Sequence, residues 1–126
     1  MLAELEETQP ENATVQQALG RRDYEEGAMD QAITHLEQAA KLDGKSAATY
    51  GWLSEALAQR ERFEEAIAAS EKAVSLDPWN ALYQKALIER FISAKQYDKA
   101  LAAMEHYVEA FPEDSGMRKA LEFARK

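Results

Sequence analysis

Two histidines, His35 and His106, are the side chains of this sequence best suited to acid–base or metal chemistry. They stand far apart in the chain, and neither has a second ligand at the spacing that metal sites use. The chain has no cysteine, which excludes disulfides, thiolate metal sites and a cysteine nucleophile. It also lacks a glycine-rich phosphate loop, and adjacent glutamates such as Glu64 and Glu65 are typical of solvated faces. We therefore expect no enzyme activity, no cofactor and no metal, and we expect both histidines at the surface, exposed or half-buried.

Recognition of another molecule is the second kind of chemistry that these residue types support. Trp52 is a large, rigid and amphipathic side chain of the kind that dominates binding hot spots. The cations Arg21, Lys85 and Lys119 could meet a carboxylate of a ligand, although Glu residues close to them make the same surface mixed in charge. Which of these side chains share a surface depends on the elements that carry them.

The composition indicates an ordinary soluble domain rather than a nucleic-acid or membrane protein. The 126 residues carry a net charge of −8, and 46% of them are hydrophobic. Basic residues never form the dense patch that phosphate binding requires, so we expect no nucleic-acid partner. No apolar stretch is long enough to cross a bilayer, and residues 1–7 do not have the layout of a signal peptide. If the chain is complete, these features favour the cytoplasm; the compartment is otherwise open.

The sequence repeats at a fixed interval, the mark of a repeat architecture. Four positions show the period first: Pro10, Gly44, Pro78 and Pro112. Two positions after each of them comes a side chain that can cap a helix: Asn12, Ser46, Asn80 and Asp114. Leucines hold the same register at Leu19, Leu53, Leu87 and Leu121. Because several columns agree at once, the chain is predicted to contain a tandem array of one helical unit.

Each unit contains two segments with helical spacing of apolar residues. The first helices are predicted at 13–26, 47–59 and 81–93, and the second helices at 30–42, 63–76 and 97–110. The chain is accordingly divided into units 13–46, 47–80 and 81–114, followed by a capping helix over 115–126. Residues 1–12 are predicted to form a short helix or a partial repeat. Gly20 is interpreted as a site of close helix packing and Gly27 as a turn.

The period and the columns together resemble the tetratricopeptide repeat family. The middle unit carries the resemblance most clearly, at Tyr50, Leu53, Ser54, Leu57, Ala66, Ala73 and Pro78. Four positions depart from the family pattern: Asp23 replaces a large apolar residue, Ser70 a large residue, Tyr107 a small one and Ile88 a glycine or alanine. We expect Tyr24 to compensate for Asp23, and we expect Ser70 and Tyr107 to change local packing without breaking the fold.

The resemblance implies an all-α fold, in which antiparallel helix pairs stack into a right-handed superhelical solenoid. First helices would line a concave groove that holds a peptide or a segment of a partner protein. The side chains expected to face it are Gln17, Arg21, Tyr24, Trp52, Glu55, Leu82, Lys85, Ala86, Glu89 and Lys119. The lining is completed by Thr14, Ala18 and Glu25 of the first unit, Ala48, Gly51 and Gln59 of the second, Ile92 of the third and Phe123 of the last helix.

Two interpretations of Trp52 remain open at this point. It either anchors an apolar ligand in the groove or packs against the neighbouring helix pair. Trp79, which lies in a turn, is expected to cover the junction between two units. One subfamily grips the carboxyl terminus of chaperone peptides, and the corresponding places here hold Gln17, Arg21, Trp52, Leu82 and Ala86. Only Arg21 keeps a comparable charge, so an apolar segment is favoured over a carboxylate tail.

The sequence therefore predicts a protein-interaction module for a peptide or partner protein with an apolar segment. Two alternatives remain: a self-associating scaffold that forms a homodimer through an uncapped N-terminal end, and a small secretion-type chaperone, which is also acidic and built from three such repeats.

Overall fold

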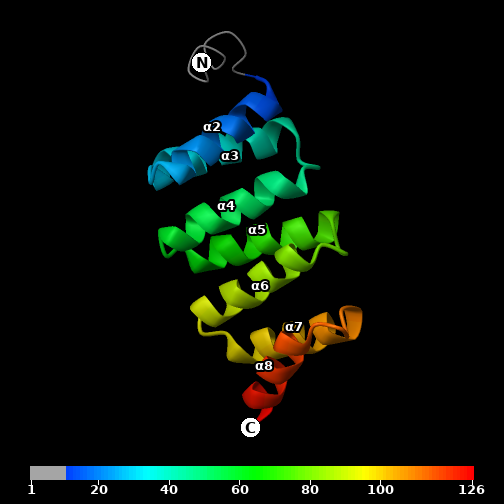
Figure 1. Ribbon diagram of the computed structural model, residues 1–126. Helices are drawn as coiled ribbons and strands as arrows, with labels where there is room; N and C mark the ends of the chain where they lie inside the picture. The colour runs from blue at the N-terminus through cyan, green and yellow to red at the C-terminus, as the bar shows by residue number, and fades with distance from the viewer. Residues whose placement is uncertain (1–10) are drawn as a thin grey trace.

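The computed structural model describes residues 11–126, and every element in this range is an α-helix. The helices are α2 (Ala13–Glu25), α3 (Met29–Leu42), α4 (Ala47–Gln59), α5 (Phe63–Leu76), α6 (Ala81–Ser93), α7 (Tyr97–Ala110) and α8 (Ser115–Arg125). They follow one another down a single stack, from the N-terminal end to the C-terminal end (Figure 1). The predicted helix ranges are confirmed to within one residue at each end. The predicted short helix over 1–12 falls almost entirely outside the described residues.

Local signals explain why the helices begin where they do. Asn12, Ser46, Asn80 and Asp114 each accept a hydrogen bond from a backbone N–H in the first turn of α2, α4, α6 and α8. This confirms the predicted capping role of all four side chains, which satisfies N–H groups that have no partner within the helix. Gly27 has a φ of 83° in the turn between α2 and α3, a conformation that glycine adopts without strain.

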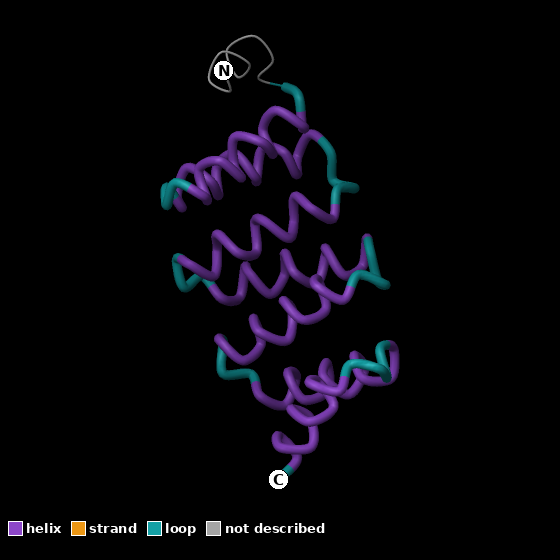
Figure 2. Tube along the Cα trace, viewed as in Figure 1, coloured by secondary structure: helices purple, strands orange, loops and turns teal. Residues whose placement is uncertain are grey.

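The helices form antiparallel pairs that stack as a right-handed superhelical solenoid, with short turns between them (Figure 2). Each helix packs against the next one along the chain, and α2 also contacts α4. The core runs along the stack as three clusters of buried residues, centred on Leu36 and Leu57, on Ile67 and Phe91, and on Met104 and Tyr107. Each cluster contains residues from two neighbouring units, or from the last unit and α8, so the core joins every unit to the next.

Paired changes in side-chain volume explain the departures at Ser70 and Ile88. Gly20 faces Leu36, and a Cβ on Gly20 would lie 2.5 Å from the Leu36 Cγ. One unit later Ser54 faces Ser70, with 2.5 Å between their hydroxyl oxygens. In the third unit Ile88 and Met104 share one cluster. A small residue thus faces a large one in the first unit, two small polar residues face each other in the second, and two large residues pack in one cluster in the third. The interpretation of Gly20 as a close-packing site is confirmed.

Asp23 is held in the core by polar contacts that the sequence did not indicate. Its carboxylate is almost fully buried, and its Oδ2 lies 2.6 Å from Nδ1 of His35 in α3. The Arg22 guanidinium lies 3.4 Å from Oδ1 of the same carboxylate. Because a buried carboxylate is stable only when it is paired and hydrogen-bonded, these contacts allow an acid to replace an apolar residue here. Tyr24 packs against the Trp52 ring of α4 and against the core cluster of Leu36.

Candidate functional site: the row of first helices

The first helices of the three units are α2, α4 and α6, and α8 follows them in the same row. Gln17 of α2 makes a contact between α2 and α4. Its Oε1 accepts hydrogen bonds from the hydroxyl groups of Thr49, at 2.6 Å, and Ser46, at 3.2 Å, at the start of α4. Thr49 is buried, so this contact is part of the packing between α2 and α4. The Gln17 carbonyl oxygen is consequently occupied by its own chain, which leaves only the amide N–H groups to offer to a ligand.

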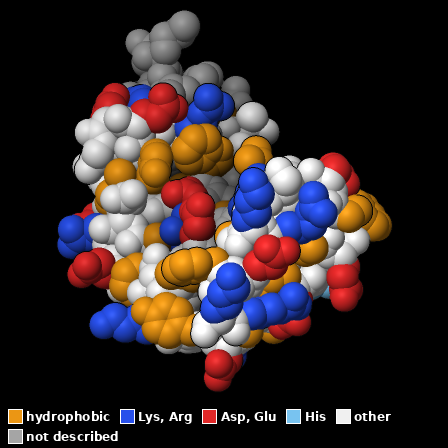
Figure 3. Space-filling view, turned by 60° about the horizontal axis from the view of Figure 1, so that its bottom comes forward, with side chains coloured by type: hydrophobic (Ala, Val, Ile, Leu, Met, Phe, Trp, Pro, Cys, Tyr) orange, Lys and Arg blue, Asp and Glu red, His pale blue; other side chains and the backbone are white. Residues whose placement is uncertain are grey.

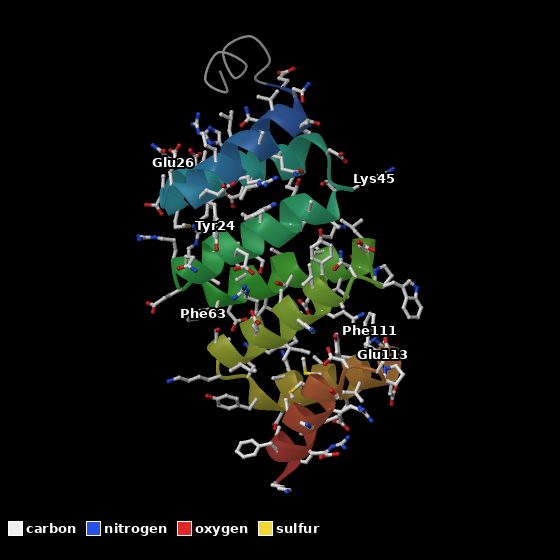
Figure 4. All side chains as sticks on the ribbon, in the orientation of Figure 1. Tyr24, Glu26, Lys45, Phe63, Phe111 and Glu113 are labelled. Atoms are coloured by element: carbon white, nitrogen blue, oxygen red, sulfur yellow. The ribbon has the colours of Figure 1, made fainter. Side chains whose placement is uncertain are left out.

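Arg21, Tyr24 and Trp52 form one aromatic cluster between α2 and α4. The rings of Tyr24 and Trp52 meet edge to face with centroids 5.4 Å apart, and the Arg21 guanidinium carbon lies 5.4 Å from the Trp52 centroid. Figure 4 shows Tyr24 between the two helices. Trp52 is partly buried and packs against the core cluster of Leu36. Of the two interpretations of Trp52, the one in which it packs against a neighbouring helix pair is therefore seen in the structure. Arg21 is the more exposed member of the cluster.

The next contact, between α4 and α6, depends on a residue that the sequence did not single out. Arg90 of α6 is buried and lies 2.5 Å from the Glu55 carboxylate, and its Nε donates to the Ser54 hydroxyl at 3.3 Å. Ser54 donates to the backbone carbonyl of Ala66, so the Ser70 hydroxyl donates to Ser54. The only sequence signal for this contact was the small volume of Ser70, because a small residue at this position leaves room for a long side chain from another helix.

The last contact in the row joins α6 to the start of α8 through Lys85. Its ammonium lies 3.2 Å from Oδ2 of Asp114 and 5.7 Å from the Tyr107 ring centroid. The buried Tyr107 donates its hydroxyl to the same Oδ2 at 2.7 Å. Hydrogen bonds from Tyr107, from the backbone N–H of Met117 and from Lys85 lower the pKa of Asp114 from 3.8 to about 2. Lys85 thus forms an ion pair within the fold, while 42% of its side chain stays exposed.

This junction predicts a loss of stability in acid. The folded-state pKa of Asp114 lies below its unfolded value, so its stabilising effect is complete above about pH 4 and is lost as the pH falls through 2. We expect the urea midpoint of the wild type to exceed that of Asp114→Asn at pH 7, because asparagine keeps the helix cap but not the charge. The two midpoints should converge by about pH 2. A constant difference across this range would show that the carboxylate charge does not stabilise α8.

The remaining predicted groove residues make no cross-helix contact of this kind. Leu82, Glu89 and Lys119 are exposed and Ala86 is half-buried; Leu82 has 74% of its surface accessible. A cavity of about 450 Å³ lies against α2 and is lined in part by Thr14, Gln17, Ala18, Arg21 and Glu25. Figure 3 shows a hollow in which acidic and basic side chains lie together, with hydrophobic side chains around it. The row of first helices thus offers a mixed surface, apolar at Leu82 and charged beside it.

The side chains first considered for chemistry do not assemble into a reactive site. His35 is half-buried against Asp23, and His106 is exposed on α7. Among residues 11–126, no group of three or more His, Cys, Asp or Glu side chains is placed to hold a metal ion. Over the same range no helix combines the length and apolarity that a membrane crossing needs.

The fold and this row define a class of protein: an all-α repeat solenoid with one face built from its first helices. The sequence model of the tetratricopeptide repeat family matches residues 23–86 and 57–122, which together span most of the chain. The chain therefore belongs to the tetratricopeptide repeat family. No curated protein sequence matches it.

Solved structures support the same fold. The structure of MamA has a TM-score of 0.88 at 24% identity, covering 98% of this chain and 72% of MamA. The tetratricopeptide domain of OM64 from Arabidopsis has a TM-score of 0.76 at 21% identity, covering 90% and 93% of the two chains. The first such domain of Spaghetti (RPAP3), bound to the HSP90 peptide SRMEEVD, has a TM-score of 0.77 at 17% identity and covers 90% of each chain.

Proposed function

We propose that this chain is a protein-interaction module that holds an extended segment of a partner protein along its row of first helices. The observation that carries the proposal is the set of side chains that tie α2, α4, α6 and α8 into one preformed surface. A preformed surface lowers the entropy cost of binding, because few of its side chains have to be ordered when the ligand arrives. The structure of Spaghetti with a bound peptide supports this mode for a chain of the same fold.

The ligand that fits this surface has an apolar residue and no requirement for a free carboxyl terminus. Leu82 is a large apolar side chain that the row leaves exposed, as is Phe123 at its far end, and Arg21 is the accessible cation beside the Trp52 ring. Gln17 and Lys85 are both occupied by contacts within the chain. We therefore expect the SRMEEVD peptide to show no saturable binding, in contrast to the complex reported for Spaghetti.

A selection from a phage-displayed library of random peptides tests the proposal. The selected peptides should lose at least about tenfold in affinity for Leu82→Glu and for Arg21→Glu, measured by fluorescence polarisation. Both side chains are exposed, so the variants should keep their fold, which circular dichroism checks. Trp79→Glu is the matched control, because Trp79 is 75% exposed but lies in the turn before α6. Equal affinity for all four proteins would exclude the row of first helices as the binding surface.

Self-association through the N-terminal end is not favoured by the described residues. The outer side chains of α2 include Thr14, Arg21 and Glu25, which are polar and exposed. Residues 1–10 lie outside the described range. The interaction module is therefore preferred to the scaffold.

A further inference from the structure

The three junctions between consecutive helix pairs can be compared position by position, because the chain repeats with a fixed period. At the first junction, the rings of Trp52 and Tyr24 meet edge to face. Trp52, Tyr24 and Met29 all pack against the core cluster that contains Ala32, Ile33, Leu36 and Ala56. Trp52 thus fills the space between the second helix of one unit and the first helix of the next. The residue types at the matching positions decide what fills the later junctions.

At the second junction Ala86 stands at the position that matches Trp52, and the Arg90 side chain fills the space between the helices instead. Arg90 stands one full repeat after Ala56, and its buried side chain reaches Ser54 and Glu55. Ser54 and Ser70 are small and leave room for the arginine, and its hydrogen-bond partners are Ser54 and Glu55. The chain therefore closes this junction with its own arginine.

The third junction has neither of these side chains and is open. The matching positions hold Ala120, in place of Trp52, and Ala124, in place of Ala56 and Arg90. A cavity of about 510 Å³ lies there, and its lining residues are Ile92, Tyr97, Asp98, Ala100, Leu101, Met104, Ala120 and Ala124. With the exception of Asp98, each lining residue stands two full repeats after a residue that belongs to, or packs against, the core cluster of the first junction. Asp98 stands two repeats after Asp30.

The exposure of the lining side chains agrees with the absence of a large side chain over the third junction. Tyr97 is 60% and Ile92 46% exposed, whereas the matching Met29 and Tyr24 are half-buried, and Tyr24 is in contact with the Trp52 ring. Leu101 is half-buried where Ile33 is buried. Apolar side chains that stay open to water in this way are favourable sites for a further apolar group, since covering them removes their contact with water.

We infer that the cavity between α7 and α8 is a binding site for one aromatic side chain, of about the size of an indole, from the partner protein. Trp52 shows which chemistry the equivalent site accepts: a ring in edge-to-face contact with an aromatic side chain and packed against a cluster of alanine, leucine and isoleucine side chains. Enclosed apolar cavities bind benzene, and an aromatic ring is likewise a suitable occupant for this more open cavity, because most of its lining residues are apolar. The inference rests on the proposed interaction function and adds an anchor point at the C-terminal end of the row.

The test uses indole as the probe and Ala120→Trp as the variant that fills the cavity. Amide shifts in an NMR titration should place indole at α7 and α8 of the wild type, and Ala120→Trp should weaken this binding at least about tenfold. The variant should fold, since Trp52 occupies the equivalent place. Ala102→Trp adds a tryptophan at an exposed position of α7 away from the cavity lining, and it should bind indole like the wild type. Indole shifts that are absent, or unchanged in Ala120→Trp, would overturn the site.

Peptides selected on the wild type provide the second arm. Replacing the aromatic residue of a peptide with alanine should weaken its binding to the wild type but not to Ala120→Trp. The Leu82→Glu variant of the protein should bind every selected peptide more weakly. If Leu82→Glu alone has an effect, the row of first helices binds partners and the cavity does not. If indole binds but no selected peptide does, the cavity stands and the proposed function fails.

A second copy of the chain is the alternative occupant, because the exposed Trp79 could supply the ring. Sedimentation velocity over a concentration series decides between them. A monomer at every concentration supports an external partner. Self-association that is abolished both by Trp79→Ala and by Ala120→Trp would assign the site to another copy and overturn our choice of occupant.

Discussion

Replacing Gly20 with valine should cost about 3 kcal/mol of the free energy of unfolding, measured by urea denaturation. A Cβ at this position would lie 2.5 Å and 2.8 Å from Leu36 side-chain atoms and 3.3 Å from the Ala32 carbonyl oxygen. Leu36 is fully buried, so it cannot move aside without disturbing the core, and the carbonyl belongs to the backbone of α3. Strain of this kind cannot be relieved by a rotamer change, and the helices α2 and α3 must separate.

Gly116→Ala is the control for this substitution. Gly116 lies in the first turn of α8, and a Cβ there would meet only an Asp114 side-chain oxygen at an ordinary 3.5 Å. Alanine reduces the entropy of the unfolded chain, so this variant should be neutral or more stable by up to about 1 kcal/mol. If Gly20→Val unfolded at the same urea concentration as the wild type, close packing of α2 on α3 would be excluded as the reason for the glycine.

Replacing Arg90 with methionine should cost about 2 kcal/mol, although it removes only the guanidinium and keeps an apolar stem. The guanidinium holds Glu55 and Ser54 of α4 against α6, and removing it leaves a carboxylate without its partner. Loss of one member of a buried ion pair costs more than the pair is worth, because the other charge remains in a poor environment. We place the cost below that of a fully buried pair, since Glu55 keeps about a third of its side chain in water.

Arg62→Met provides the comparison for Arg90→Met. Arg62 pairs with Glu65 at 2.7 Å, but both side chains are about half exposed and lie one turn apart. Water solvates both charges when the pair is broken, so the urea midpoint should stay close to that of the wild type. Arg90→Lys should fall between the two, because lysine keeps the charge but cannot reach Ser54 and Glu55 with a planar fork. Equal effects of Arg90→Met and Arg62→Met would show that the α4–α6 contact contributes no stability.

The sequence alone determined the helices, their order and their caps. Those features depend on residues close in the chain: a capping side chain bonds to an N–H two or three positions later, and apolar residues recur along one helical face. The fixed period adds a second constraint, since similar units must stack in the same way. For these reasons the helix ranges and the family were predictable, and the close packing at Gly20 could be recognised from one residue and its register.

Polar pairings across the stack were decided only by the tertiary structure. Arg90 reaches Ser54 and Glu55 over 36 and 35 positions, and Gln17 reaches Thr49 over 32. Each pairing depends on side-chain length and on the volume left by another residue, such as Ser70, which no periodic pattern specifies. Asp23 shows the same limit, because its partner His35 lies on the opposite helix and was interpreted from sequence only as a surface histidine.

The same distinction separates Trp52 from the cavity near Ala120. A tryptophan off the apolar stripe was visible in the sequence, but whether its ring faced a ligand or a neighbour depended on where Tyr24 and Arg21 lay. An alanine at the equivalent place in the last helix carries no signal of its own. Its significance appears only when three stacked junctions are compared in space, because a cavity is defined by side chains that surround it and not by any one residue.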